Sequence, residues 1–215
     1  RGLGDVYKRQ LMGEERVGAL LNSISSARLE RYLQICDQDK PRAIELYERN
    51  LRLAAAFYVP LQCWEVTLRN HFNNLASDAF GANWLCEPHR FARGDFINPV
   101  KYPLSKQPAV SGTSLIAELT LGFWVALLGP QYTETLWKPL FFKAFTHNGK
   151  FMSRKVVHGR FNALRRFRNR VAHHEPIIFN DLAHTHAELI EAISWMCPIT
   201  AEWTAEQSSV MRHLP

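Results

Sequence analysis

Apolar residues recur every three or four positions along most of this chain of 215 residues, and the longest such run extends from Pro41 to Phe80. This spacing places the apolar side chains on one face of an α-helix. Proline suits the first turn of a helix, because its missing N–H is not needed there, and Gly81 is a favourable end. Pro60 lies inside the run and is expected to kink the helix.

Helical periodicity also dominates the rest of the chain, and no stretch alternates apolar and polar residues for long enough to predict a strand. The fold class is therefore expected to be all-α, a single helical bundle with a long kinked N-terminal helix. Serine or aspartate precedes several of the expected helices as an N-cap. Further helices are expected over residues 26–37, 114–128, 133–145, 154–174, 182–197 and 201–213, and one long irregular loop over residues 83–112.

The first ten residues, RGLGDVYKRQ, resemble a translated sequencing adapter joined to an open reading frame. A segment of that origin is non-native and is not expected to contribute to the fold. Residues 11–215 are expected to form one domain. With 47% hydrophobic residues, a chain of this length can bury a sizeable core.

Membrane and secretory classes are not expected from the sequence. The most apolar run, residues 119–128, is shorter than the roughly 20 residues that cross a bilayer, and no signal peptide is recognised. The four cysteines are far apart and form no C-x-x-C pair, which is typical of reduced cysteines. The chain is therefore expected to be cytoplasmic.

The net charge of +6 is distributed unevenly, because no Asp or Glu occurs between Glu134 and Glu175. A basic segment of this kind attracts polyanions, and phosphate binding is the favoured interpretation. The alternative is an ordinary solvated helix face. The basic residues of this segment are Lys138, Lys143, Lys150, Arg154, Lys155, Arg160, Arg165, Arg166, Arg168 and Arg170.

Arg168 is the residue of this segment that folding explains least. On a helical wheel it falls within the apolar stripe formed by Val157, Phe161, Leu164 and Val171. A guanidinium there needs a carboxylate, another subunit or a ligand phosphate as its partner, because an unpaired buried charge costs several kcal/mol.

Asn169 and His173 share a helix face, about 40° apart, whereas Arg168 and His173 are separated by about 140° on an ideal helix. Convergence of Arg168 and His173 on one phosphate requires a distorted last turn or a second copy of the chain. The angles therefore favour a symmetric dimer.

The run Arg168-Asn169-Arg170-Val171-Ala172-His173 resembles the R-N-x-x-x-H motif of the HEPN superfamily. Its context, RNRVAHHEPI, together with the segments WEVTLRN at 64–70 and GANWL at 81–85, is similar to the Abi-like (abortive infection) branch. The similarity covers most of residues 28–196. It implies an all-α HEPN-like fold and a homodimer whose two motifs face a shared cleft.

The resemblance further implies a metal-independent endoribonuclease of a phage-defence or toxin–antitoxin system, which needs no cofactor and leaves a 2′,3′-cyclic phosphate. Histidine suits proton transfer near neutral pH, and arginine suits the charge that develops on phosphorus. The implied catalytic residues are Arg168, Asn169 and His173. The candidates for holding the RNA backbone are Arg165, Arg166, Arg170, Arg160, Lys155 and Arg154.

Several alternatives stay open at this stage. His174 also satisfies the spacing from Arg168, and a histidine in the last turn of a helix can simply cap it. Arg69, Asn70 and His71 on the long helix are candidates for lining the cleft. His184 and His186 point in nearly opposite directions on a helix, so a shared metal ion is not expected. The alternative functions are a catalytically silent module that binds RNA or a nucleotide, and a regulatory protein that pairs with an acidic antitoxin or another partner.

Overall fold

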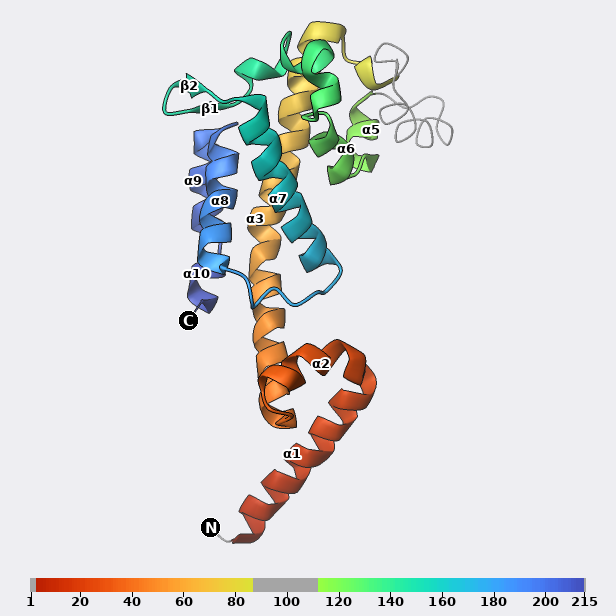
Figure 1. Ribbon diagram of the computed structural model, residues 1–215, viewed down its shortest axis with the longest axis vertical. Helices are drawn as coiled ribbons and strands as arrows, with labels where there is room; N and C mark the ends of the chain where they lie inside the picture. Colours follow the sequence, from red (N-terminus) through yellow and green to blue (C-terminus); the bar gives the residue numbers. More distant parts are fainter. Residues whose placement is uncertain (1–2, 87–111, 215) are drawn as a thin grey trace.

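The computed structural model describes residues 3–86 and 112–214, and its longest element is helix α3, Lys40–Phe80 (Figure 1). Asp39 caps the start of α3, where its Oδ1 accepts a hydrogen bond of 3.1 Å from the N–H of Arg42. Gly81 ends the helix with a φ of 91°, a conformation that glycine adopts without a steric penalty. The helix continues across Pro60. At 1.5 Å per residue, α3 extends for roughly 60 Å.

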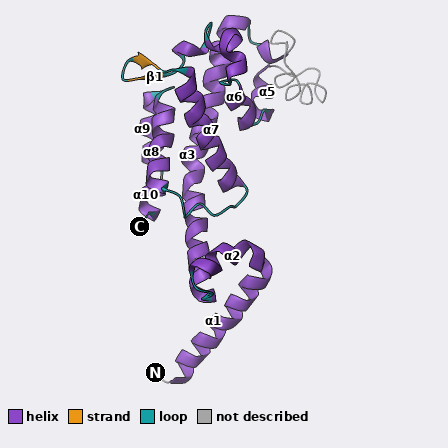
Figure 2. Ribbon diagram, viewed as in Figure 1, coloured by secondary structure: helices purple, strands orange, loops and turns teal. Residues whose placement is uncertain are grey.

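The described residues form an all-α fold, as predicted, with one small hairpin as the exception (Figure 2). Helices α7, α8 and α9 pack alongside α3, whereas α2 contacts its N-terminal end (Figure 1). The short helices η3 and η5 are 3₁₀ turns, and η4 is a π-helical turn. The other elements are α1 Leu3–Ile24, α2 Ser26–Ile35, η1 Trp84–Cys86, α5 Gly112–Glu118, α6 Leu121–Ala126, η3 Pro130–Tyr132, η4 Thr133–Trp137, η5 Phe141–Lys143, β1 Thr146–His147, β2 Lys150–Phe151, α7 Arg154–Ala172, α8 Leu182–Ser194, α9 Pro198–Gln207 and α10 Val210–His213.

Several predicted boundaries are wrong. The expected helix at 114–128 is divided into α5 and α6, because the Thr120 side chain caps a new helix by accepting from the N–H of Phe123. The segment 133–145 forms short turns around Pro139, which has no N–H for a helical hydrogen bond. The last expected helix breaks between α9 and α10 at Ser208 and Ser209. Most of the expected loop at 83–112 lies outside the described residues.

One helix and one hairpin were not anticipated. Helix α1 begins at Leu3, so the backbone of the adapter-like segment continues directly into it. Strands β1 and β2 form an antiparallel hairpin closed by Asn148 and Gly149, both of which have positive φ. Asn-Gly is a dipeptide favoured in two-residue hairpin turns, so this hairpin was predictable from the sequence.

Aromatic side chains fill the core between α3, α7 and the η elements. Phe72 and Phe141 stack with their ring centroids 4.1 Å apart, and Trp64 meets Phe161 edge to face at 5.6 Å. Helix α7 buries Val157, Phe161, Leu164 and Phe167. Three of these were predicted, but Phe167 rather than Val171 completes the buried face, and Val171 is only partly buried.

Asn50 is a buried polar residue of α3, and its side chain is only 2% exposed. Its Oδ1 accepts hydrogen bonds from the backbone N–H groups of Ile177 at 2.8 Å and Ile178 at 3.1 Å. This one oxygen therefore fixes the segment after α7 against α3 and satisfies two backbone donors.

Replacing Asn50 by alanine should lower the free energy of unfolding by about 2 kcal/mol, because both donors lose their acceptor. Asn74→Ala is the matched control, since Asn74 is exposed on the same helix and carries the same change in helix propensity. Urea unfolding of the two variants measures the difference. Equal stability of the two variants would contradict this role of Asn50.

Within the described ranges, no helix combines the length and the apolar character needed to span a membrane.

Candidate functional site

Helix α7 ends two residues before the predicted end, in a tight turn made by His173 and His174. The His174 N–H donates to the carbonyl of Val171, and the Glu175 N–H donates to that of Arg170. These two bonds are those of a Schellman motif, in which the residue after the C-cap adopts a left-handed conformation and is usually glycine. Here that residue is His174, with a φ of 58°.

Substituting His174 by glycine should therefore raise the free energy of unfolding by about 1 kcal/mol, because the left-handed conformation no longer strains a side chain. His173→Gly is the control, and it should lower stability, since His173 has an ordinary φ of −90°. Urea unfolding measures both variants. A His174→Gly variant less stable than the wild type would show that the turn is not strained.

A groove of about 820 Å³ runs between α3 and the end of α7, and we name it the α3–α7 groove. Its walls come from α3 between Leu51 and Arg69 and from α7 and its terminal turn between Arg168 and His174. Much of the lining is apolar, with charged groups gathered towards Arg69 and Arg168. Such a combination suits a ligand that has both apolar and anionic parts.

Arg168 meets one of the three partners expected for it, a carboxylate. Its Nη2 lies 3.2 Å from Oε2 of Glu65 on α3, and the Arg168 side chain is 37% exposed. The ion pair explains how a guanidinium is accommodated beside the apolar face of α7. Glu65 was not predicted as a partner, because the sequence does not reveal which carboxylate α3 presents to α7.

The structure separates the two candidate histidines. His174 lines the α3–α7 groove together with Arg168, whereas His173 does not. His173 lines a second pocket of about 730 Å³ between α2 and the turn, and His174 contributes to both. We name this second space the α2 pocket. Asn169 is half-buried, and its backbone carbonyl accepts from the N–H of His173.

The remaining cleft candidates on α3 have different environments. Arg69 lines the α3–α7 groove and Asn70 is exposed. His71 lies 2.8 Å through its Nε2 from the carbonyl oxygen of Ala144 and packs edge to face on Phe145. Burial lowers the pKa of His71, so this histidine is held neutral against the core.

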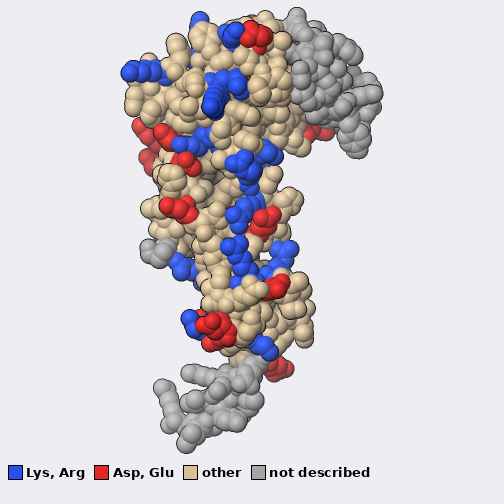
Figure 3. Space-filling view, in the orientation of Figure 1, with Lys and Arg blue, Asp and Glu red and all other residues tan. Residues whose placement is uncertain are grey.

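The basic residues proposed to hold RNA differ in their exposure and in the hydrogen bonds that they form within the chain. Figure 3 shows Lys and Arg side chains down the middle of one face of the molecule, with acidic side chains among and beside them. Lys155 and Arg166 are exposed. Arg154 donates to the carbonyl of Leu128 at 2.9 Å. Arg165 donates twice to Oδ1 of Asn162, at 3.1 and 2.9 Å.

Arg170 contacts three residues of the segment that follows α7. Its guanidinium donates to Oδ1 of Asn180 and to the carbonyl of Pro176, and its Nε lies 3.4 Å from Oε2 of Glu175. Arg170 therefore shapes the turn that carries the two histidines.

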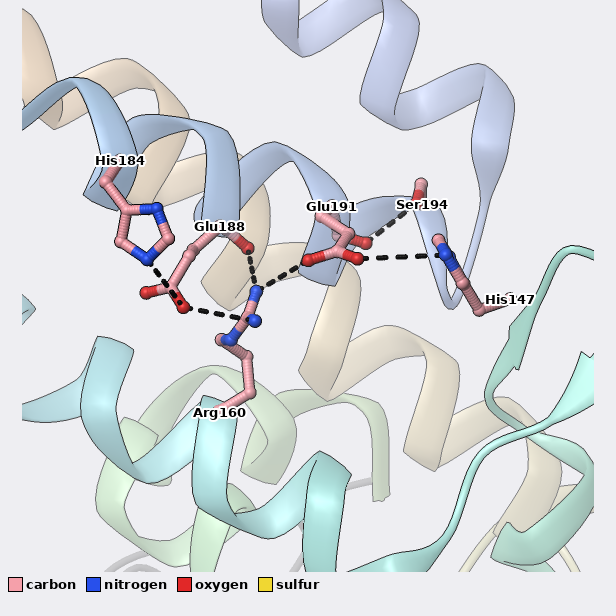
Figure 4. Close-up of polar contacts among 6 residues, drawn as sticks. All are labelled: His147, Arg160, His184, Glu188, Glu191 and Ser194. Atoms are coloured by element: carbon pink, nitrogen blue, oxygen red, sulfur yellow. Dashed lines mark hydrogen bonds and ion pairs between the residues drawn. The ribbon is translucent and has the colours of Figure 1, made fainter.

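Arg160 joins α7 to α8 through two carboxylates (Figure 4). Its guanidinium lies 3.1 Å from Glu188 and 2.7 Å from Glu191, and it packs over the ring of Trp195. His184 and His147 flank this cluster, 3.3 Å from Glu188 and 3.8 Å from Glu191. An RNA phosphate at Arg160 would have to compete with both carboxylates.

The histidine and cysteine residues show no metal site in the described ranges, where no group of three or more His, Cys, Asp or Glu has a suitable geometry. His186 is buried, lies 2.9 Å through its Nε2 from the hydroxyl of Ser208, and has a pKa lowered by burial. Cys36, Cys63 and Cys197 are free thiols.

Comparisons of the chain with protein-family models, with curated proteins and with solved structures gave no match. The resemblance to the HEPN superfamily therefore depends on the quoted sequence motifs alone, and the activity that it implies is developed below as a proposal.

Proposed function

We propose that this protein is a metal-independent endoribonuclease of the HEPN type, acting in a phage-defence or toxin–antitoxin system. The observation that carries the proposal is the common position of Arg168, Arg69 and His174 in the α3–α7 groove. Two guanidinium groups provide permanent positive charge for a phosphodiester, and an imidazole provides proton transfer near neutral pH. The groove thus supplies the residue types needed to cleave RNA.

In this reaction the 2′-hydroxyl of the RNA attacks the adjacent phosphorus, and the bond to the 5′-oxygen of the next nucleotide breaks. The products are a 2′,3′-cyclic phosphate and a 5′-hydroxyl. A histidine removes the proton of the attacking hydroxyl or donates one to the leaving oxygen. Arg168, oriented by Glu65, stabilises the negative charge that develops on the phosphate, and Arg69 binds the substrate backbone.

His174 is better placed than His173 for the proton transfer. The left-handed turn supplies the distortion of the last helical turn that an ideal helix lacks, and it places His174 in the same groove as Arg168. His173 remains the histidine that the family motif favours, so each residue requires its own variant.

The test is incubation of the protein with a mixed RNA pool in excess EDTA, followed by analysis of the product ends. We expect wild-type cleavage that leaves cyclic phosphates, and a loss of rate of about a hundredfold or more in His174→Ala. His213→Ala, at an exposed histidine of α10 outside the groove, is the control. Toxicity on expression should follow the same order among the variants.

Two results would contradict parts of this proposal. Intact RNA with every protein would overturn the endoribonuclease. A loss of activity in His173→Ala but not in His174→Ala would move the proton transfer to the α2 pocket.

A second copy of the chain is the proposed partner at the rim of the groove. Leu51 and Tyr58 on α3, which line the groove, are exposed large apolar side chains, and Tyr58 is 65% exposed. Exposed apolar residues clustered on one helix are typical of protein contacts. A homodimer through this rim would also bring two copies of the Arg168 motif together.

Tyr58→Glu should therefore convert the dimer into a monomer, because a charge would be buried at the interface. Ile199→Glu is the control, since Ile199 is an exposed apolar residue on α9, away from the groove. Analytical ultracentrifugation at micromolar concentration measures the mass of each protein. A monomeric wild type would contradict the dimer.

The ion pair between Arg168 and Glu65 favours a second candidate function, a catalytically silent RNA-binding module. Glu65 competes with phosphate for the guanidinium, and this competition disfavours a tight transition-state contact. Salt-sensitive RNA binding without cleavage would distinguish this function from the endoribonuclease.

A further inference from the structure

Helix α7 carries a row of polar side chains that the proposed cleavage reaction does not use. Arg154, His158, Asn162 and Arg165 follow one another at steps of three or four residues, within about 80° on a helical wheel. All four are partly buried, and we name them the α7 row. Helix α7 contains no Asp or Glu, so no carboxylate of its own helix neutralises the row.

The two arginines of the α7 row donate hydrogen bonds only to uncharged acceptors. Arg154 donates to the carbonyl of Leu128, and Arg165 donates to Oδ1 of Asn162. Neither arginine forms an ion pair within residues 3–86 and 112–214, whereas Arg160, on another face of α7, is neutralised by two carboxylates (Figure 4). The charge of the α7 row is therefore available to an anionic ligand.

His158 lies one helical turn after Arg154 and about two turns before Arg165. Burial is the main cause that lowers the pKa of His158, and the charges of the two guanidinium groups lower it further. No carboxylate of the described ranges acts on this imidazole. A neutral imidazole beside two positive charges marks a place where an anion would be stabilised.

The elements packed against α7 do not supply a negative charge to the row. Helix α6 has no titratable side chain. Glu65 on α3 pairs with Arg168. Glu188 and Glu191 on α8 pair with Arg160. The carboxylates that α3 and α8 present to α7 are thus used by arginines outside the row.

Asn162 holds the guanidinium of Arg165 in one orientation. Both Nε and Nη2 of Arg165 donate to the same Oδ1, at 3.1 and 2.9 Å, and Nη1 forms no hydrogen bond in the described part of the chain. A guanidinium that is fixed along one edge loses less conformational freedom when another edge binds a ligand. Phosphate is an anion that suits such an edge, because it accepts two parallel N–H bonds.

The α7 row leads along its helix to the α3–α7 groove. Arg168, which lines the groove, follows Arg165 by three residues. From Arg154 to Arg168 the helix rises by about 21 Å, the length of about six phosphates at the 3.4 Å spacing of a stacked strand. Figure 3, in the orientation of Figure 1, shows Lys and Arg side chains over the part of the face where α7 runs.

We propose that the α7 row binds backbone phosphates of a single RNA strand whose scissile phosphate occupies the α3–α7 groove. Arg154 and Arg165 provide permanent charge, His158 donates a hydrogen bond, and Asn162 positions Arg165. A straight row on one helix follows one backbone, as in proteins that bind single strands. This assignment of the substrate rests on the proposed function.

The α7 row is tested with a 2′-O-methyl RNA oligonucleotide, which cannot undergo 2′-hydroxyl attack, by fluorescence anisotropy over a range of salt concentrations. Arg165→Gln should weaken binding about tenfold and reduce the salt slope by about 0.7, the value for one phosphate contact on a single strand. The thermal unfolding midpoint should be unchanged, because the hydrogen bonds of Arg165 stay within α7. Arg212→Gln is the matched control, since Arg212 is exposed on α10 and does not line the groove.

His158→Gln provides a second, independent measurement. A phosphate bound beside His158 raises the pKa of the imidazole, so RNA binding takes up a proton and the wild-type affinity rises as the pH falls. Between about pH 8 and about pH 6 the affinity should rise about fivefold more in the wild type than in His158→Gln. His213→Gln, at an exposed histidine of α10, should keep the wild-type dependence.

Three results would overturn the α7 row. They are equal weakening by Arg165→Gln and Arg212→Gln, an unchanged pH dependence in His158→Gln, and tighter binding of the same oligonucleotide as a duplex. In each of these cases the proposed endoribonuclease stands if the wild type cleaves RNA in EDTA.

The opposite separation is also measurable. Binding that depends on Arg165 and His158, without cleavage, would support the α7 row and overturn the endoribonuclease. A wild type that neither binds nor cleaves RNA would overturn both proposals.

Discussion

The amide oxygen of Asn50 holds the segment after α7 in place, and both spaces described above depend on that position. Helix α3 is long enough to reach from α2 to the aromatic core, but its length alone does not fix the end of α7. The hydrogen bonds that Asn50 accepts from the N–H groups of Ile177 and Ile178 attach the chain to α3 just after the His173–His174 turn. Residues of this turn line both the α3–α7 groove and the α2 pocket, so the attachment supports one wall of each.

The arginines of the chain divide into those that maintain the fold and those available to a ligand. Arg160 and Arg170 are surrounded by carboxylate, amide or carbonyl oxygens, and their charge is used to join elements. Arg168 belongs to both groups, because it pairs with Glu65 while its side chain remains partly exposed and lines the groove. Charge counted along a sequence therefore overestimates the part of a basic segment that can meet a polyanion.

The sequence predicts best the features that depend on nearby residues. Ser25, Ser153 and Asp181 cap the helices that follow them, as expected, because an N-cap bond spans only three residues. The pairing of Arg168 with Glu65 was not predictable as a specific contact, since it requires the relative placement of α3 and α7. The helical wheel likewise could not place His174 in the groove, because the wheel assumes an undistorted helix and the Schellman turn departs from it.

The left-handed turn also constrains how position 174 can vary during evolution. Folding alone favours glycine there, because glycine accepts a positive φ without a steric cost. Selection for the imidazole would keep histidine at this position despite that preference. In a lineage that has lost the need for that group, drift at position 174 should lead to glycine before any change appears in the buried face of α7. The residue type at position 174 should therefore indicate whether the imidazole is still required.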